Sequence, residues 1–221
     1  MNAEIKTGII FGGLIAAGVV FLAILFIGLD ESVSIIQDSG IKKAPNLVGI
    51  SDYLNTTPEK LSKDMENKVI LYDIWTYSCV NCIRTLPYIT AWDEKYADQG
   101  LLIIGIHSPE FEFEKKSENV QVAIDKYGIH YPVVLDNDMK TWKAFENNYW
   151  PRKYIADHQG NLRYDHIGEG GYQETEKIIQ QLLEERSKAM KIESASTATS
   201  LVSIEEFEHT LFRTPELYFG Y

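Results

Sequence analysis

The sequence contains only two cysteines, and this scarcity excludes a framework of structural disulfides. Both belong to a single Cys-x-x-Cys pair, Cys79 and Cys82, so no cysteine remains for another bridge. A zinc site built on the pair would need two further ligands. The five histidines show no paired ligand spacing. The sequence therefore predicts no metal site, and nothing in it indicates another cofactor.

Positive charge is also in short supply. The chain carries 21 lysines and arginines against 32 aspartates and glutamates, a formal net charge of −11. This balance argues against nucleic acid as a partner. No internal repeat is visible. With 221 residues, 45% of them hydrophobic, the chain is expected to form one domain with a full core, plus appendages.

One long segment lacks charge altogether. Residues 9–29 contain no charged side chain, and about 20 such residues span the hydrocarbon layer of a membrane. The segment is longer than the apolar region of a signal peptide, and no Ala-x-Ala cleavage site follows it. It is therefore predicted to be an uncleaved single-pass anchor, with a cleaved signal peptide as the alternative.

The residues on either side of this segment indicate its orientation. Residues 1–8 contain Lys6 and the amino terminus, whereas Asp30 and Glu31 follow the segment directly. This arrangement favours a short cytoplasmic N-terminus with the rest of the chain outside. The predicted location is therefore the cell membrane, with lipid around the anchor and residues 30–43 as a spacer above it.

The two cysteines lie at a predicted junction between a strand and a helix. Residues 69–75 are almost continuously apolar, as expected of a strand covered on both faces. Through residues 79–96, apolar side chains recur every three or four positions, which predicts a helix. A Cys-x-x-Cys pair at such a junction indicates a redox site rather than two unreactive core cysteines.

The predicted chemistry follows from the position of each sulfur. If the helix begins at Cys79, its unpaired backbone N–H groups point at that sulfur, and the helix dipole favours a thiolate there. The thiolate is the attacking species in disulfide exchange. Cys82 lies one turn further into the helix, so we expect it to resolve the mixed disulfide by attacking Cys79.

Asp73 stands out because it lies within the apolar run. A buried carboxylate is costly unless it has a partner or a function. Burial would raise its pKa, which suits proton exchange with Cys82 during resolution. The alternative is an aspartate on an edge strand that faces solvent.

This stretch resembles the active site of the thioredoxin superfamily. Asp73, Trp75 and Pro87 stand where the superfamily carries a buried acid, a tryptophan and a proline that kinks the helix. Residues 74–87 are similar to the thioredoxin-like domain of DipZ proteins, within the TlpA-like class. The dipeptide between the cysteines is Val-Asn rather than the Gly-Pro of thioredoxin. The resemblance extends over about residues 44–221.

The resemblance also implies a role for Pro151. In thioredoxin-like folds a cis proline precedes a strand and packs beside the cysteine pair, and Pro151 precedes a predicted strand at residues 152–156. The backbone of its loop would pair with an extended substrate segment, and Trp150 would flank that groove. The alternative is a trans proline at the start of a strand.

The order of predicted strands and helices fits an α/β, thioredoxin-like fold with a four- or five-stranded mixed sheet and helices on both faces. A short hairpin is expected after Leu47, with turn signals at residues 55–58. The thioredoxin-like domain is assigned to residues 44–190, and a linker and tail to residues 191–221. His107 directly follows a predicted strand, and we expect it to be structural rather than to touch substrate.

Together these patterns predict a membrane-anchored, extracytoplasmic thiol–disulfide oxidoreductase. Its expected partners are protein thiols or disulfides and an electron donor, either membrane-bound or soluble. One alternative is a thiol peroxidase of the peroxiredoxin type, although Tyr-Ser-Cys lacks the Pro-x-x-x-Thr-x-x-Cys setting of that group. The other is a non-catalytic binding module on a thioredoxin-like frame.

Overall fold

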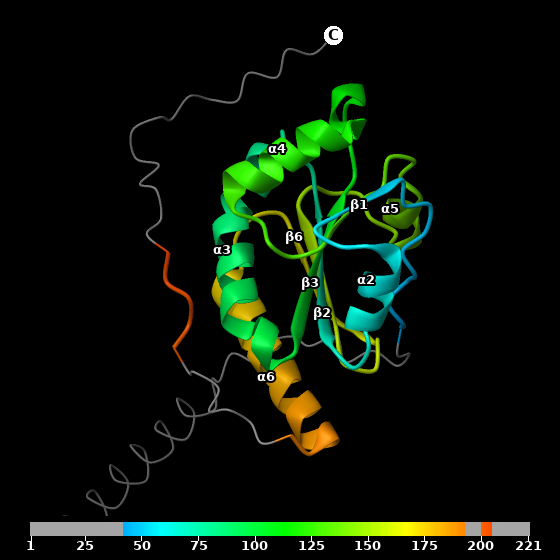
Figure 1. Cartoon of the computed structure of the whole chain (residues 1–221). Coiled ribbons are helices and arrows are strands. Elements are labelled where there is room, and N and C mark those ends of the chain that lie inside the picture. The colour runs from blue at the N-terminus through cyan, green and yellow to red at the C-terminus, as the bar shows by residue number, and fades with distance from the viewer. Residues whose placement is uncertain (1–41, 193–199, 205–221) are drawn as a thin grey trace, which may run out of the picture. The chain divides into compact units, whose positions relative to one another are not determined.

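The computed structural model describes residues 42–192 and 200–204 (Figure 1). The predicted anchor at residues 9–29, most of the spacer and most of the C-terminal tail lie outside the described residues. Within the described part, none of the helices has the length and hydrophobicity that a membrane crossing requires.

Six strands form one mixed sheet in the order β1-β4-β3-β2-β5-β6. Strands β2, β3 and β4 run parallel to one another, whereas β1, β5 and β6 join by antiparallel pairing. The mixed sheet confirms the predicted fold class, but it has more strands than the four or five expected. The strands are β1 Asp52–Leu54, β2 Val69–Trp75, β3 Leu101–His107, β4 Val133–Leu135, β5 Arg152–Ala156 and β6 Leu162–Ile167.

The predicted hairpin before β2 is wrong. Strand β1 pairs with β4 instead of with a neighbour in the sequence. The residues interpreted as a turn, 55–58, lead into helix α2 (Pro58–Asp64). Thr57 caps this helix by accepting a hydrogen bond from the Lys60 backbone N–H, and Pro58 at the first helical position suits a helix start. The turn signals at residues 55–58 are ambiguous, because threonine followed by proline suits the start of a helix as well as a turn.

Helices cover both faces of the sheet, as predicted (Figure 1). Helices α3 and α6 lie against one face, and α2 and α5 lie against the other. The helix predicted at residues 79–96 is confirmed as α3. The remaining helical bounds are α3 Val80–Tyr96, α4 Ser117–Tyr127, α5 Lys140–Ala144 and α6 Tyr172–Met190, with 3₁₀ turns η1 at Ala97–Gln99 and η2 at Glu112–Lys115.

The central strand β2 is buried on both faces, and every residue in it is at most 4% exposed. Successive side chains of a strand point to opposite faces. One set joins the core under α2 and α5: Ile70, Tyr72 and Ile74. Asp73 and Trp75 therefore point to the other face, beneath α3 and α6. This alternation puts a carboxylate under the helix that begins with the cysteine pair.

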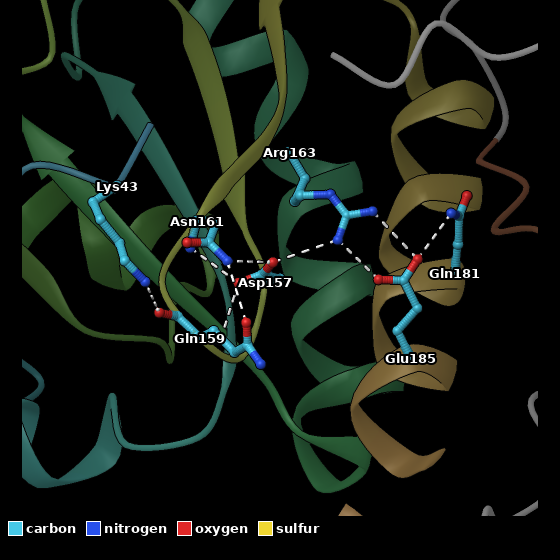
Figure 2. Close-up of polar contacts among 7 residues, drawn as sticks. All are labelled: Lys43, Asp157, Gln159, Asn161, Arg163, Gln181 and Glu185. Carbon is cyan, nitrogen blue, oxygen red and sulfur yellow. Dashed lines mark hydrogen bonds and ion pairs between the residues drawn. The ribbon is translucent and has the colours of Figure 1, made fainter. Parts of the chain in front are cut away.

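Charged and amide side chains fix the turn between β5 and β6 (Figure 2). The Asp157 carboxylate accepts N–H bonds from within its own turn. Arg163 bridges Asp157, at 3.4 Å, and Glu185 of α6, at 2.9 Å. The Lys43 ammonium donates to the Gln159 carbonyl oxygen at 2.8 Å. This end of the β5–β6 hairpin is thus attached both to α6 and to the segment before β1.

Candidate active site

Cys79 occupies the N-cap position of α3, in agreement with the predicted start of the helix at this residue. Its Sγ accepts a hydrogen bond from the Cys82 backbone N–H at 3.3 Å, and its side chain is partly exposed. A hydrogen bond from the Cys82 side chain has the largest effect on the Cys79 pKa. Together with the backbone N–H groups of Cys82 and Asn81, and against the opposing effect of burial, it lowers this pKa to about 7. A large share of Cys79 is therefore thiolate near neutral pH.

Cys82 is completely buried, in contrast to Cys79. Burial raises the pKa of its thiol well above the ordinary range, and the hydrogen bond to Cys79 and the charge of that residue raise it further. The buried sulfur therefore holds its proton while the exposed sulfur is ionised. Within the described residues, no cluster of three or more histidine, cysteine, aspartate or glutamate side chains is arranged to hold a metal ion.

Asp73 is completely buried, which rules out the alternative of a solvent-facing edge-strand residue. Burial raises the pKa of its carboxyl group to about 6, although the positive charge of Lys153 acts in the opposite direction. Its negative charge in turn contributes to the raised pKa of Cys82, so the two groups share one electrostatic environment. Within the described chain, neither carboxylate oxygen has a hydrogen-bond partner.

Lys153 was not singled out by the sequence, yet it lies directly across from Asp73. The register of β2 and β5 pairs these two residues, and Lys153 is as inaccessible to solvent as Asp73. Its Nζ donates to the Gly168 carbonyl oxygen at 3.2 Å. Burial lowers the pKa of Lys153, against the charges of Asp73, Cys82 and Glu169. The available signal was a lysine directly before the apolar residues 154–156 of a predicted strand.

The Trp150–Pro151 peptide bond is cis, as the resemblance implied. Because Ile74 of β2 pairs with Arg152, Pro151 lies alongside the end of β2, from which the chain continues to Cys79. The Pro151 carbonyl oxygen accepts a hydrogen bond from the Gly168 N–H at 2.8 Å. The proline loop is therefore held beside the end of β2 that leads to the cysteine pair.

The Trp150 side chain is turned toward the loop that follows β3. Its Nε1 donates to the Ser108 carbonyl oxygen at 2.9 Å, and its ring packs against Trp142 with centroids 4.1 Å apart. The indole is only partly buried. It therefore forms a fixed side of the surface next to Pro151, and the groove-flanking role expected of it stays a prediction.

His107, at the end of β3, is buried, and burial lowers its pKa to about 4. The neutral ring accepts the Tyr77 backbone N–H at its Nε2, at 3.4 Å, and the same nitrogen lies 3.3 Å from the Thr76 hydroxyl. The Tyr77 ring stacks on it, with centroids 5.6 Å apart. These contacts fix the chain just before Cys79 and agree with the structural role expected of His107.

Glu114 is a second buried acid that the sequence did not reveal. Its carboxylate accepts hydrogen bonds from the Ser78 hydroxyl at 2.5 Å and from the backbone N–H groups of Glu110, at 2.6 Å, and Phe111, at 2.8 Å. Burial alone would raise its pKa, but these and other hydrogen bonds lower it. Glu114 thus ties η2 to the residue before Cys79. Nothing in the sequence separates it from the exposed Glu112 nearby.

The fold and the paired thiols place this chain in the class of thioredoxin-like thiol–disulfide oxidoreductases. Comparison with known families gives the assignment within that class. Residues 41–183 match the family model described as Redoxin, and the chain belongs to this family.

Individual relatives agree with this assignment. Protein DipZ of Mycobacterium tuberculosis (strain CDC 1551 / Oshkosh) is 40% identical over 179 residues, which cover 80% of this chain but only 25% of DipZ. The thiol-disulfide oxidoreductase YkuV of Bacillus subtilis (strain 168) is 31% identical over 143 residues, 64% of this chain and 94% of YkuV. The solution structure of a thioredoxin-like protein in the oxidized form has 29% identity and a TM-score of 0.58, and the match covers 66% of this chain and 97% of that one. The predicted resemblance to the superfamily and to DipZ is confirmed.

Proposed function

We propose that this chain exchanges disulfides with protein partners outside the cell membrane, with Cys79 as the attacking thiol and Cys82 as the resolving thiol. The observation that carries the proposal is the contrast between the two sulfurs. Cys79 is partly exposed at a helix N-terminus, with a pKa of about 7, whereas Cys82 is fully buried with a raised pKa. Only one of them can meet a substrate, and it is the one that ionises.

In the reducing direction the Cys79 thiolate attacks one sulfur of the substrate disulfide, and one substrate thiolate leaves. The Asp73 carboxylate then takes the proton from the Cys82 thiol. The Cys82 thiolate attacks Cys79, the second substrate thiolate leaves, and a Cys79–Cys82 disulfide remains. Two electrons have passed to the substrate, and an electron-donating partner, membrane-bound or soluble, returns them.

The loop around Pro151 is the proposed binding surface for the substrate chain. The Pro151 carbonyl oxygen is already bonded to the Gly168 N–H. An extended substrate segment would therefore pair with the backbone of Trp150, the residue before it, while the fixed indole limits how far the segment shifts sideways. A protein disulfide on an extended segment fits this arrangement.

The proposed location at the membrane is supported by the uncharged run at residues 9–29 and by the acidic residues that follow it. Fractionation of cells that express the full chain should leave it in membranes washed with alkaline carbonate. Protease added outside intact spheroplasts should digest residues 44–190. Protection of this region would contradict the proposed orientation.

The proposed roles of the cysteines can be tested by single-turnover reaction of full-length variants with a disulfide-bonded peptide. Cys82→Ser should accumulate a stable mixed disulfide through Cys79. Cys79→Ser should not, and the double variant provides the background. Equal trapping in both single variants would end the assignment of roles. Faster turnover of hydrogen peroxide than of the peptide disulfide would favour the peroxidase alternative.

A further inference from the structure

Two phenylalanines in the loop after β3 expose their rings. Phe111 is 49% exposed and Phe113 is 51% exposed. The two rings stack, with centroids 5.5 Å apart and 5° between their planes, and Phe113 also meets the Tyr77 ring at 6.2 Å. The Tyr77 hydroxyl donates to the Phe113 carbonyl oxygen at 3.3 Å. Contiguous exposed aromatic rings are typical of surfaces that bind another protein.

Hydrogen bonds fix these rings next to the attacking sulfur. Ser78, the residue before Cys79, donates to the Glu114 carboxylate at 2.5 Å. The same carboxylate accepts the Phe111 backbone N–H at 2.8 Å. The loop after β3 and the segment that leads into α3 therefore form one connected unit, with the exposed rings beside Cys79.

Glu110 adds an unpaired negative charge to this unit. Its backbone N–H is bonded to the buried carboxylate of the unit at 2.6 Å. Within the described residues its exposed side chain forms no hydrogen bond or ion pair, whereas Glu112 pairs with Lys115 at 2.6 Å. The hydrogen bond from Cys82 has the largest effect on the Cys79 pKa and lowers it, while the charge of Glu110 acts in the opposite direction. The free carboxylate is therefore within electrostatic range of the attacking sulfur.

Glu110 and Phe111 also line a groove of about 750 Å³. Trp142 lines the same groove and packs against Trp150, with ring centroids 4.1 Å apart. The groove therefore continues the surface on which an extended partner segment is proposed to pair with Trp150. Lys143 lines it as well, but it belongs to α5 and not to the loop that carries Glu110. A segment bound at Trp150 thus has both the open ring and the free carboxylate within reach.

An aromatic ring next to a free carboxylate suits an arginine side chain. The guanidinium group is planar, stacks on aromatic faces and forms two parallel hydrogen bonds with a carboxylate. Phe113 covers one face of the Phe111 ring, and the half-exposed state of Phe111 leaves the other face open. The net charge of −11 adds a general attraction for basic partners.

We propose that Glu110 and Phe111 form a binding site for an arginine that lies beside the disulfide of the partner protein. The guanidinium stacks on the Phe111 ring and pairs with the Glu110 carboxylate. This inference rests on the proposed disulfide exchange and adds the class of partner, which is a basic protein with arginine next to its reactive cysteine.

The test compares two disulfide-bonded peptides that differ only in the residue beside the cysteine, arginine or its uncharged isostere citrulline. The reduced full-length chain is used in excess at pH 7, at concentrations where the single-turnover rate rises linearly, so that the rate of attack is measured. Each rate is divided by the rate of the same peptide with 2-mercaptoethanol, which removes the effect of the arginine charge on the disulfide itself. The wild-type chain should then prefer arginine about fivefold, and high salt should reduce this preference.

Matched variants assign the preference to the two residues. Glu110→Gln should bring it to about one, and the ratio of two peptides cancels any change in the reactivity of Cys79. Phe111→Leu should lower the preference about twofold, and Phe111→Tyr should retain it. Glu118→Gln makes the same change of charge on α4, outside the groove, and should leave the preference unchanged.

The outcomes separate this site from the proposed function. A wild-type preference of about one, with both peptides reacting, would overturn the arginine site and leave the disulfide exchange standing. An arginine preference that survives in Glu110→Gln would overturn it too, as would a faster normalised reaction of a leucine peptide. Failure of the wild-type chain to react with any of the peptides would overturn the proposed function, and this site with it.

Discussion

Asp73 and Lys153 face one another across β2 and β5, and neither is exposed to solvent. Each charge alone would be costly to bury. The attraction between the two charges offsets part of the cost of removing them from water. Burial raises the Asp73 pKa to about 6 and lowers that of Lys153, while their mutual attraction acts in the opposite direction on both. Burial therefore has the larger effect on the pKa of Asp73, and Lys153 lowers the pH range in which Asp73 can accept a proton.

Replacing Lys153 should move the pH dependence of resolution. In Lys153→Met the Asp73 pKa should rise further above 6, by about one unit, because the opposite charge is gone. Asp73 acts as a base only when ionised, so resolution at pH 7 should slow and recover at higher pH. Single-turnover rates across the pH range measure this shift. Lys63→Met, on the exposed side of α2, is the control, and an unchanged midpoint in Lys153→Met would remove Lys153 from the mechanism.

Asp73→Asn should make the protein more stable at neutral pH. The folded-state pKa of Asp73 is raised from 3.8 to about 6, so its contribution to stability is fully present below the unfolded value and is lost as pH rises through about 6. The full loss is about 3 kcal/mol at most, and asparagine avoids it. Urea unfolding at pH 4 and pH 7 should show a larger gain for the variant at pH 7. Equal gains at both pH values would mean that the carboxylate is not desolvated.

Alkylation should distinguish the two thiols by pH. The rate of Cys79 modification by iodoacetamide should rise with pH through a midpoint of about 7, because the thiolate is the reactive form. Cys82 should remain unmodified in the folded chain. In Cys82→Ala the Cys79 midpoint should move up, since the largest influence lowering its pKa is removed. Mass spectrometry of quenched samples measures each site, and a midpoint that does not respond to Cys82→Ala would contradict this account.

Loss of the Glu114 side chain should loosen the segment before Cys79. Glu114→Ala removes the carboxylate that accepts hydrogen bonds from the Ser78 hydroxyl, from the Phe111 backbone N–H and from one further backbone N–H. Leaving such donors unpaired should lower the free energy of unfolding by about 2 kcal/mol. Urea denaturation measures the change. Glu112→Ala removes an exposed neighbour and should be nearly neutral, and an equal effect in both variants would show that burial of Glu114 is unimportant.

The parts of the site that could be predicted are those encoded in one short segment. Cys79, Cys82 and Asp73 lie on a single strand–turn–helix unit, so their spacing fixes their relation. Lys153 and Glu114 acquire their importance from partners distant in the sequence, as when Glu114 binds Ser78 across 36 positions. Such pairings depend on strand order and register, which local patterns do not determine. The pairing of β1 could not be predicted for the same reason, since its partner strand β4 lies far away in the sequence, with Asp52 opposite Leu135.

The attachment of the β5–β6 turn to α6 bears on how a partner docks. Arg163, clamped between Asp157 and Glu185, anchors one end of a hairpin whose other end carries the cis proline. Because the hairpin is anchored in this way, we expect its proline end to move little when a partner protein docks there. We therefore expect the conformational change on docking to occur in the segment of the partner that carries the disulfide, which favours partners whose disulfides lie in flexible segments.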